Sequence, residues 1–334
     1  MLEALAGESA VQEVVGIARR RPQREFPRTR FVEADIVTDD LEELFAGSDA
    51  VIHLAWLIQP GHDESVTRAV NVTGSRRVFE AAASAGVPSL LYASSVGAYS
   101  AGPKDRLVPE SWPTDGTPTS FYARHKAITE RQLDRLERER PELRVVRLRP
   151  ALVFKRAAAS EIRRLFIGPF LPRWMVRPEW IPFVPDLPRL RFQAVHSLDV
   201  GDAFRRALVS GARGAFNLAA EPVIGARELA EVLDARPLKL PAALLRAGAA
   251  ATFKLHLQPS EPGWVDMALA VPLMDSTRAR EELGWVPQHS ATDALAELLA
   301  GIRSASDLDT PPLARGTSGP ARLRELLTGV GSRV

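Results

Sequence analysis

The alternation of short apolar segments with longer amphipathic ones constrains the fold of this chain more than any other feature of its sequence. Short segments of strand character predict strands at 11–18, 29–33, 50–55, 90–94, 143–148, 192–196 and 214–218. Amphipathic runs predict helices at 2–7, 40–46, 65–83, 120–137 and 225–233, and a further helix after Asp199, which would serve as its N-cap. Strands that alternate with helices form parallel sheets covered by helices on both faces. We therefore predict an α/β fold built on a doubly wound parallel sheet.

The composition excludes several classes of protein. The 43 basic residues nearly balance the 41 acidic ones and are scattered, so we expect no nucleic-acid partner. The chain has no cysteine, which rules out disulfides and thiol nucleophiles, and we expect no metal site. The start lacks the pattern of a signal peptide, and the apolar run at 242–253 is interrupted by Arg246. These observations predict a cytoplasmic protein with no membrane partner.

Tyr122 and Lys126 are the first candidates for catalytic residues. They stand four residues apart in a predicted helix, so both side chains project from one face and can act on a single group. A free tyrosine has a pKa of about 10, and a cation held close to it favours the phenolate. We expect Lys126 to supply that cation and Tyr122 to serve as a proton acid or base.

Ser95 is the third candidate. The predicted strand at 90–94 runs into Ser94 and Ser95, at the end of the strand where parallel sheets present ligands. A serine pair at such a place is also common as a turn or a helix cap. Its position upstream of Tyr122 favours the functional interpretation, in which Ser95 holds a substrate oxygen.

Several motifs in order resemble those of the extended short-chain dehydrogenases/reductases, the family of NAD(P)-dependent epimerases and dehydratases. The motif of tyrosine, three residues and lysine reads Tyr122-Ala-Arg-His-Lys126, and the active-site serine matches Ser95. Further matches are Asp35-Ile36, His53-Leu54-Ala55, Asn71-Val-Thr-Gly74, Arg149-Pro150, His196 to Asp199 and Leu283-Gly-Trp-Val-Pro287. The resemblance covers residues 2 to about 300 and implies a Rossmann-type fold.

The resemblance implies a role for each matching residue. Tyr122 would exchange a proton with a substrate hydroxyl or carbonyl, Lys126 would also hold the nicotinamide ribose, and Ser95 would orient the reacting oxygen. Asp35 and Ile36 would flank the adenine of the cofactor. The other residues expected along the cofactor are Arg19, Arg20, Leu54, Ala55, Pro150 and Val153.

The chain is predicted, from the pattern of its sequence, to divide into five segments. It comprises a dinucleotide-binding domain (1–155), a loop-rich substrate insertion (156–191), a return to the sheet (192–218), a smaller interleaved substrate lobe (219–301) and a flexible tail with a short helix (302–334). The family's first strand and glycine-rich phosphate loop have no counterpart before Val11. We expect that segment, about 15 residues, to lie upstream. The alternative is a truncated paralogue that binds cofactor poorly.

The type of cofactor is suggested by the end of the strand at 11–18. NAD enzymes usually have a carboxylate there for the ribose hydroxyls, whereas this chain has Arg19 and Arg20. Arginines suit a 2′-phosphate, although a surface cluster is the competing explanation. NADP is therefore favoured over NAD.

The reaction stays open between a dehydrogenase or reductase and an epimerase. Val96 and Gly97 follow Ser95 where the family's dehydratases carry an acidic pair, which disfavours dehydration. The expected substrate is a small molecule, with a nucleotide sugar as the class that the family suggests. Its diphosphate could be bound by the arginines of the insertion, which are Arg163, Arg164, Arg173 and Arg177, although solvated surface arginines explain this cluster equally well.

Two further observations bear on function. Lys155 stands where the family commonly has a glycine, which puts the usual nucleotide-sugar pose in doubt. A different class of protein, a non-catalytic NAD(P) sensor, would keep the sheet but lose the tyrosine, and Tyr122 is present. The oligomeric state stays open, with a homodimer as the hypothesis.

Overall fold

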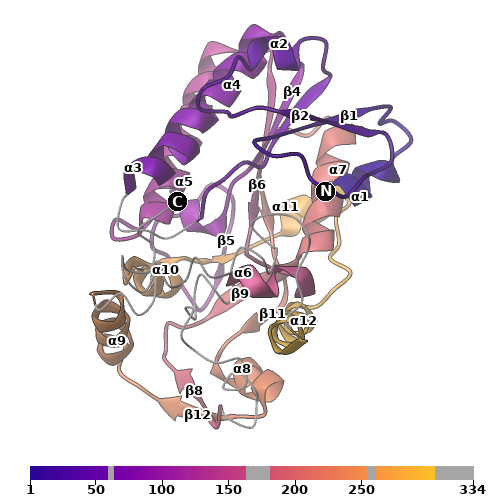
Figure 1. The fold of residues 1–334 in the computed structure, drawn as a ribbon. Coiled ribbons are helices and arrows are strands. Elements are labelled where there is room, and N and C mark those ends of the chain that lie inside the picture. Colours follow the sequence, from indigo (N-terminus) through magenta and orange to yellow (C-terminus); the bar gives the residue numbers. More distant parts are fainter. Residues whose placement is uncertain (59–63, 163–180, 255–260, 305–334) are drawn as a thin grey trace.

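A four-stranded parallel sheet forms the centre of the molecule (Figure 1). The computed structural model describes residues 1–58, 64–162, 181–254 and 261–304. In the order of the sheet, its strands are β10 (Gly214–Leu218), β6 (Arg144–Pro150), β4 (Ser89–Ala93) and β3 (Ala50–His53). Every neighbouring pair runs parallel, with Leu91 of β4 opposite both Ile52 and Val146.

Helices cover both faces of this sheet, as Figure 1 shows. On one face lie α4 (Ser75–Ser84) and α5 (Phe121–Glu139), and on the other lies α7 (Ser197–Val209). Successive residues of β4 alternate between them, because Leu90 packs with the α4 and α5 side and Leu91 with the α7 side. The predicted Rossmann-type doubly wound fold is confirmed.

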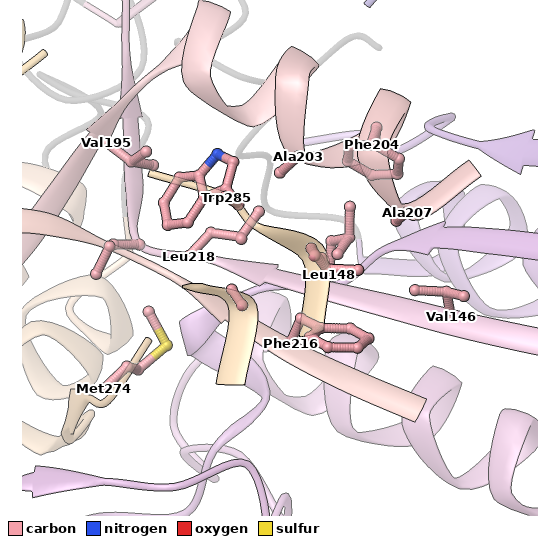
Figure 2. Packing of buried hydrophobic residues seen from close by; sticks show 14 of the residues in the cluster. Val146, Leu148, Val195, Ala203, Phe204, Ala207, Phe216, Leu218, Met274 and Trp285 are labelled. Carbon is pink, nitrogen blue, oxygen red and sulfur yellow. The ribbon is translucent and has the colours of Figure 1, made fainter. Parts of the chain in front are cut away.

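The apolar cluster beneath α7 is the larger core (Figure 2). Trp285 is fully buried there, beside Val195 and Leu218, and its indole nitrogen donates to the backbone oxygen of Asp199 over 2.8 Å. This contact fastens the chain after α11 (Thr277–Leu283) to the first turn of α7. Burial of an indole of this size stabilises the junction of the two lobes.

The sheet is interrupted on its other side. Strands β1 (Val14–Ala18) and β2 (Thr29–Glu33) pair in parallel as a separate two-stranded sheet, and α1 (Leu2–Ala6) packs against α7. Within the described ranges, no strand pairs with the second edge of β1 or of β3. In a dinucleotide-binding sheet the first strand lies between these two positions. The break therefore falls where the sequence predicted a strand to be missing.

The remaining elements build the second lobe and the connections. The strands are β5 (Leu107–Val108), β7 (Leu152–Phe154), β8 (Phe183–Asp186), β9 (Phe192–His196), β11 (Ala220–Ile224), β12 (Arg236–Lys239) and β13 (Leu273–Met274). The helices are α2 (Glu42–Phe45), α3 (Glu64–Arg68), α6 (Ala159–Ile162), α8 (Ala226–Leu233), α9 (Ala242–Lys254), α10 (Gly263–Ala270) and α12 (Ala291–Ser304). Strand β9 pairs with β7 and β11, while β5 pairs with β13 and β8 with β12. No described helix is long and apolar enough to cross a membrane.

Two predicted helices differ from those observed. The helix expected at 65–83 is split by a π-helical turn at Ala69–Gly74, in which the buried Asn71 bonds both backbone groups of Leu57. A regular helical pattern does not anticipate this tertiary contact. Helix α7 begins at Ser197 and is capped by His196. Asp199 is therefore not the N-cap; its carboxylate accepts from the backbone of Gln288 and His289.

Candidate functional site

The structure brings Ser95, Tyr122 and Lys126 together at the carboxyl end of β4. Ser95 follows the strand and caps the short turn Val96–Ala98, with its oxygen 3.0 Å from the Gly97 nitrogen. Tyr122 and Lys126 lie in the first turns of α5, which begins at the Ser120 cap. The ring of Tyr122 lies against the turn that Ser95 caps. The three residues chosen from the sequence thus form one cluster.

Gly97 allows this close approach. A Cβ at position 97 would lie 2.8 Å from the Cε1 atom of Tyr122 and 3.2 Å from the sulfur of Met267. The side chain of Tyr122 therefore packs directly on the backbone of the turn that carries Ser95. Any larger residue at 97 would force the phenol away from the serine.

Lys126 is almost fully buried, with 3% of its surface exposed. Its ammonium donates to the Ala93 oxygen over 2.7 Å and to the Tyr92 hydroxyl over 3.2 Å. The ring centroid of Trp56 lies 3.5 Å from the ammonium nitrogen. Burial lowers the pKa of Lys126 well below its ordinary value, and the nearby Glu130 carboxylate opposes that effect.

The sequence led us to expect that Lys126 lowers the pKa of Tyr122, whereas in the structure this pKa is raised. Burial raises it, and the hydrogen bond with Ser95 only partly offsets that rise. The Lys126 ammonium is 6.0 Å from the Tyr122 ring centroid and is directed at Ala93 and Tyr92. In this arrangement Tyr122 is held as a neutral phenol, which can donate a proton.

Two tryptophans flank Tyr122, and sequence reasoning missed both. Trp56 meets the Tyr122 ring edge to face at 5.9 Å, and the Trp264 ring lies 5.2 Å away on α10. Trp56 directly follows the His53-Leu54-Ala55 motif, so its place beside the site could have been found. Trp264 comes from a distant segment that packs on α5 through Met267, and no local pattern indicates it.

A buried network of charged side chains, centred on Glu130, lies next to the site. The Glu130 carboxylate accepts from the Ser94 hydroxyl at 2.5 Å and from the Arg149 guanidinium at 2.9 and 2.8 Å. Arg147 is the third partner residue, with a hydrogen bond of 2.9 Å. Glu130 stands one helical turn beyond Lys126 on the same face, so the network joins the serine pair to α5. Sequence reasoning missed Glu130, although its spacing of four residues from Lys126 was a signal.

The residues predicted to line the cofactor lie at the ends of strands or just after them. Exposed Arg19 and Arg20 follow β1, Asp35 and Ile36 follow β2, exposed Leu54 and Ala55 follow β3, Pro150 ends β6, and Val153 lies in β7. In the described part of the chain, no hydrogen bond or ion pair connects them to Tyr122 or Lys126. Lys155 caps a short turn, and the four arginines of the insertion lie outside the described residues.

Asp35 and Ile36 have structural contacts of their own. The Asp35 carboxylate accepts from the Val37 nitrogen at 2.8 Å, which closes a tight turn after β2. Ile36 packs so closely on Gly74 that a Cβ there would lie 2.8 Å from its Cδ1 atom. These contacts hold in place the loop that we expected, from the sequence, to flank the adenine of the cofactor.

The fold and the clustered serine, tyrosine and lysine define a Rossmann-type protein of the short-chain dehydrogenase kind. The chain belongs to the NAD dependent epimerase/dehydratase family, which it matches over residues 1–219. This confirms the resemblance inferred from the motifs.

Individual proteins that match the chain share only a modest part of its sequence. An uncharacterised protein of Mycobacterium tuberculosis is 26% identical over 294 residues, which are 87% of this chain and 27% of that protein. The chain thus spans about a quarter of that relative's length. The decarboxylating sterol-4-alpha-carboxylate 3-dehydrogenase of Saccharomyces cerevisiae is 31% identical over 128 residues, 37% of this chain and 36% of that protein.

Among solved structures, the UDP-glucose 4-epimerase of Thermus thermophilus in complex with NAD is similar, with a TM-score of 0.64. Its sequence identity is 20%, and the match covers 91% of this chain and 96% of that one. At this identity the similarity shows a common fold.

Proposed function

We propose that this protein is an NAD(P)-dependent oxidoreductase or epimerase that acts on a carbon bearing a hydroxyl or carbonyl group. The observation that carries the proposal is the convergence of Ser95, Tyr122 and Lys126 at the carboxyl end of β4. There the Tyr122 ring packs on the turn that Ser95 caps, and the Lys126 ammonium bonds the last residue of the strand. A phenol and a serine hydroxyl that converge on one point can bind and protonate a single substrate oxygen. Membership of the epimerase/dehydratase family supports the same chemistry.

The residues present fit a nicotinamide cofactor. Two N–H groups of the Lys126 ammonium are taken by Ala93 and Tyr92, and its third side meets the Trp56 ring with no oxygen acceptor among the described residues. A ribose hydroxyl would accept from that third N–H in place of the ring. Lys126 would hold the ribose, with Leu54, Ala55 and Val153 along the cofactor. When bound, the cofactor supplies or accepts the hydride.

The protein's own residues handle the proton. Because burial raises the pKa of Tyr122, the phenol stays protonated near neutral pH and can donate to a carbonyl oxygen that is being reduced. In the reverse direction Tyr122 must first lose its own proton, and its phenolate then accepts the proton of the substrate hydroxyl; a positive charge on Lys126 would stabilise that phenolate. Ser95 orients the oxygen through its own hydrogen bond.

The proposed substrate is a nucleotide sugar. The similar Thermus thermophilus structure is a UDP-glucose 4-epimerase, which supports this class. A dehydrogenase acting on another hydroxyl compound is the second candidate, and the yeast sterol-4-alpha-carboxylate 3-dehydrogenase supports it. Val96 and Gly97 after Ser95 favour either of these over dehydration.

For the cofactor we propose NADP in preference to NAD, on the strength of Arg19 and Arg20, which are exposed after β1. The test is to titrate the protein with NADH and NADPH, then to incubate it with each oxidised cofactor and a set of UDP-sugars and sterols. Product formation, followed by NMR, separates epimerase from dehydrogenase. Tighter binding of NADH than NADPH would overturn the NADP preference, and binding of neither would overturn the proposed function.

A further inference from the structure

The ammonium of Lys126 has no N–H to spare for a ligand. An ammonium carries three N–H groups. Two of them are used by the Ala93 oxygen at 2.7 Å and the Tyr92 hydroxyl at 3.2 Å. The third side of the nitrogen is covered by the Trp56 ring, whose centroid is 3.5 Å away. A ribose hydroxyl that is to bind Lys126 must therefore replace one of these three contacts.

Of the three, the contact with Trp56 is the one that can be released. Ala93 is the last residue of β4, and the Tyr92 hydroxyl is fully buried and also bonded to Thr129 at 2.8 Å. Trp56, in contrast, lies in the loop after β3, next to the exposed Leu54 and Ala55. Its side chain is only partly buried.

The backbone beside Trp56 is fixed. The nitrogen and oxygen of Leu57 both bond the Asn71 side chain, at 2.7 and 2.9 Å. A movement that uncovers Lys126 is therefore a rotation of the indole about its own side-chain bonds. The loop itself can keep its place.

The present position of the indole carries a cost. Its N–H is buried, and the described structure offers it no acceptor. Leaving such a donor unpaired opposes the favourable cation–π contact, and the two effects are similar in size. Two orientations of Trp56 can therefore lie close in free energy.

We propose that Trp56 occupies the place on Lys126 that the cofactor ribose takes, so that binding of the cofactor requires the indole to rotate away from the ammonium. The inference rests on the proposed function, because it assumes that Lys126 holds the ribose. It adds a residue that competes with the cofactor and thereby sets its affinity.

The test is calorimetric titration with NADH and NADPH of the wild-type protein and of Trp56→Ala, Trp56→Phe and Trp112→Ala. Trp112 is a matched control, because it is also partly buried, has a buried indole nitrogen without a partner among the described residues, and makes no contact with Lys126. Circular dichroism checks that each variant folds. Release of a desolvated cation–π contact predicts a Kd about tenfold lower in Trp56→Ala. The Kd of Trp56→Phe, which keeps a weaker cation–π contact, should lie between those of Trp56→Ala and the wild type. The Kd of Trp112→Ala should equal that of the wild type.

The outcomes separate the inference from the proposed function. A Kd that is unchanged or higher in Trp56→Ala overturns the inference while the function stands, since Trp56 would then be neutral or would hold the cofactor. Binding by Trp56→Ala but not by the wild type supports the inference strongly. No binding by any form overturns the proposed function and the inference with it. If Trp56→Ala does not fold, the comparison of Trp56→Phe with the wild type decides in the same way.

Discussion

Replacing Glu130 by glutamine should destabilise the protein strongly, because this carboxylate is the centre of a buried network. Glu130 is fully buried and binds Ser94, Arg147 and Arg149. Burial alone would raise its pKa, but the two arginines outweigh burial and lower it from 4.5 to about 2. A shift of that size corresponds to about 3 kcal/mol, and loss of one partner from a buried ion pair costs about 3–5 kcal/mol. We expect Glu130→Gln to lower the free energy of unfolding by about 3 kcal/mol at neutral pH.

Urea unfolding at several pH values measures this loss. Because the pKa is lowered on folding, the charge stabilises the native state above about pH 4.5 and this contribution fades as the pH falls towards 2. The difference between wild type and Glu130→Gln should therefore shrink by roughly half between pH 7 and pH 3. Glu139→Gln is the control, since Glu139 pairs with Arg135 on the exposed side of the same helix and should cost under about 0.5 kcal/mol. A loss below about 1 kcal/mol in Glu130→Gln, or one that does not depend on pH, would refute the reasoning.

Three other substitutions test the packing by the same unfolding assay. Trp285→Ala removes a fully buried indole and should cost about 3–5 kcal/mol; a loss near zero would mean that the lobes do not meet there. Gly263→Ala places a Cβ 2.1 Å from the Thr119 oxygen, so it should cost about 1–3 kcal/mol, and unchanged stability would contradict the close approach of α10 to the segment just before α5. Asp199→Ala leaves the backbone nitrogens of Gln288 and His289 without their acceptor and should cost about 1–3 kcal/mol, whereas a neutral effect would show that water replaces it.

The sequence predicted the sheet well, because each strand has a short apolar segment between helical or turn segments, as in Ser-Leu-Leu-Tyr-Ala of β4. The strand at 29–33 is observed with the same bounds, and the strands predicted at 50–55 and 90–94 differ from β3 and β4 by one or two residues at their ends. Parallel strands buried on both faces leave a strong local signal. The break beside β1 also followed from sequence, because an absent glycine loop implies an absent strand.

Sequence reasoning was weaker wherever tertiary contacts decide the structure. It placed Ser95, Tyr122 and Lys126 at one site from helical spacing and strand ends, but it could not give the direction of the Lys126 ammonium or the raised pKa of Tyr122. Burial sets both, and burial depends on segments as distant as Trp264. Of the short strands of the second lobe, the one predicted at 192–196 matches β9. The others were missed because two to five residues carry too little periodicity.

The measurement that tests the central proposal most directly is turnover by Tyr122→Phe. The wild type, Tyr122→Phe and Tyr99→Phe would be compared with the preferred nicotinamide cofactor and the substrate found by NMR. Tyr99 undergoes the same chemical change, but its hydroxyl binds Asn217 and Arg149 away from Ser95. The account predicts that Tyr122→Phe binds the cofactor yet loses turnover by about 10²–10⁴-fold, while Tyr99→Phe stays active. Undiminished turnover by Tyr122→Phe would contradict it.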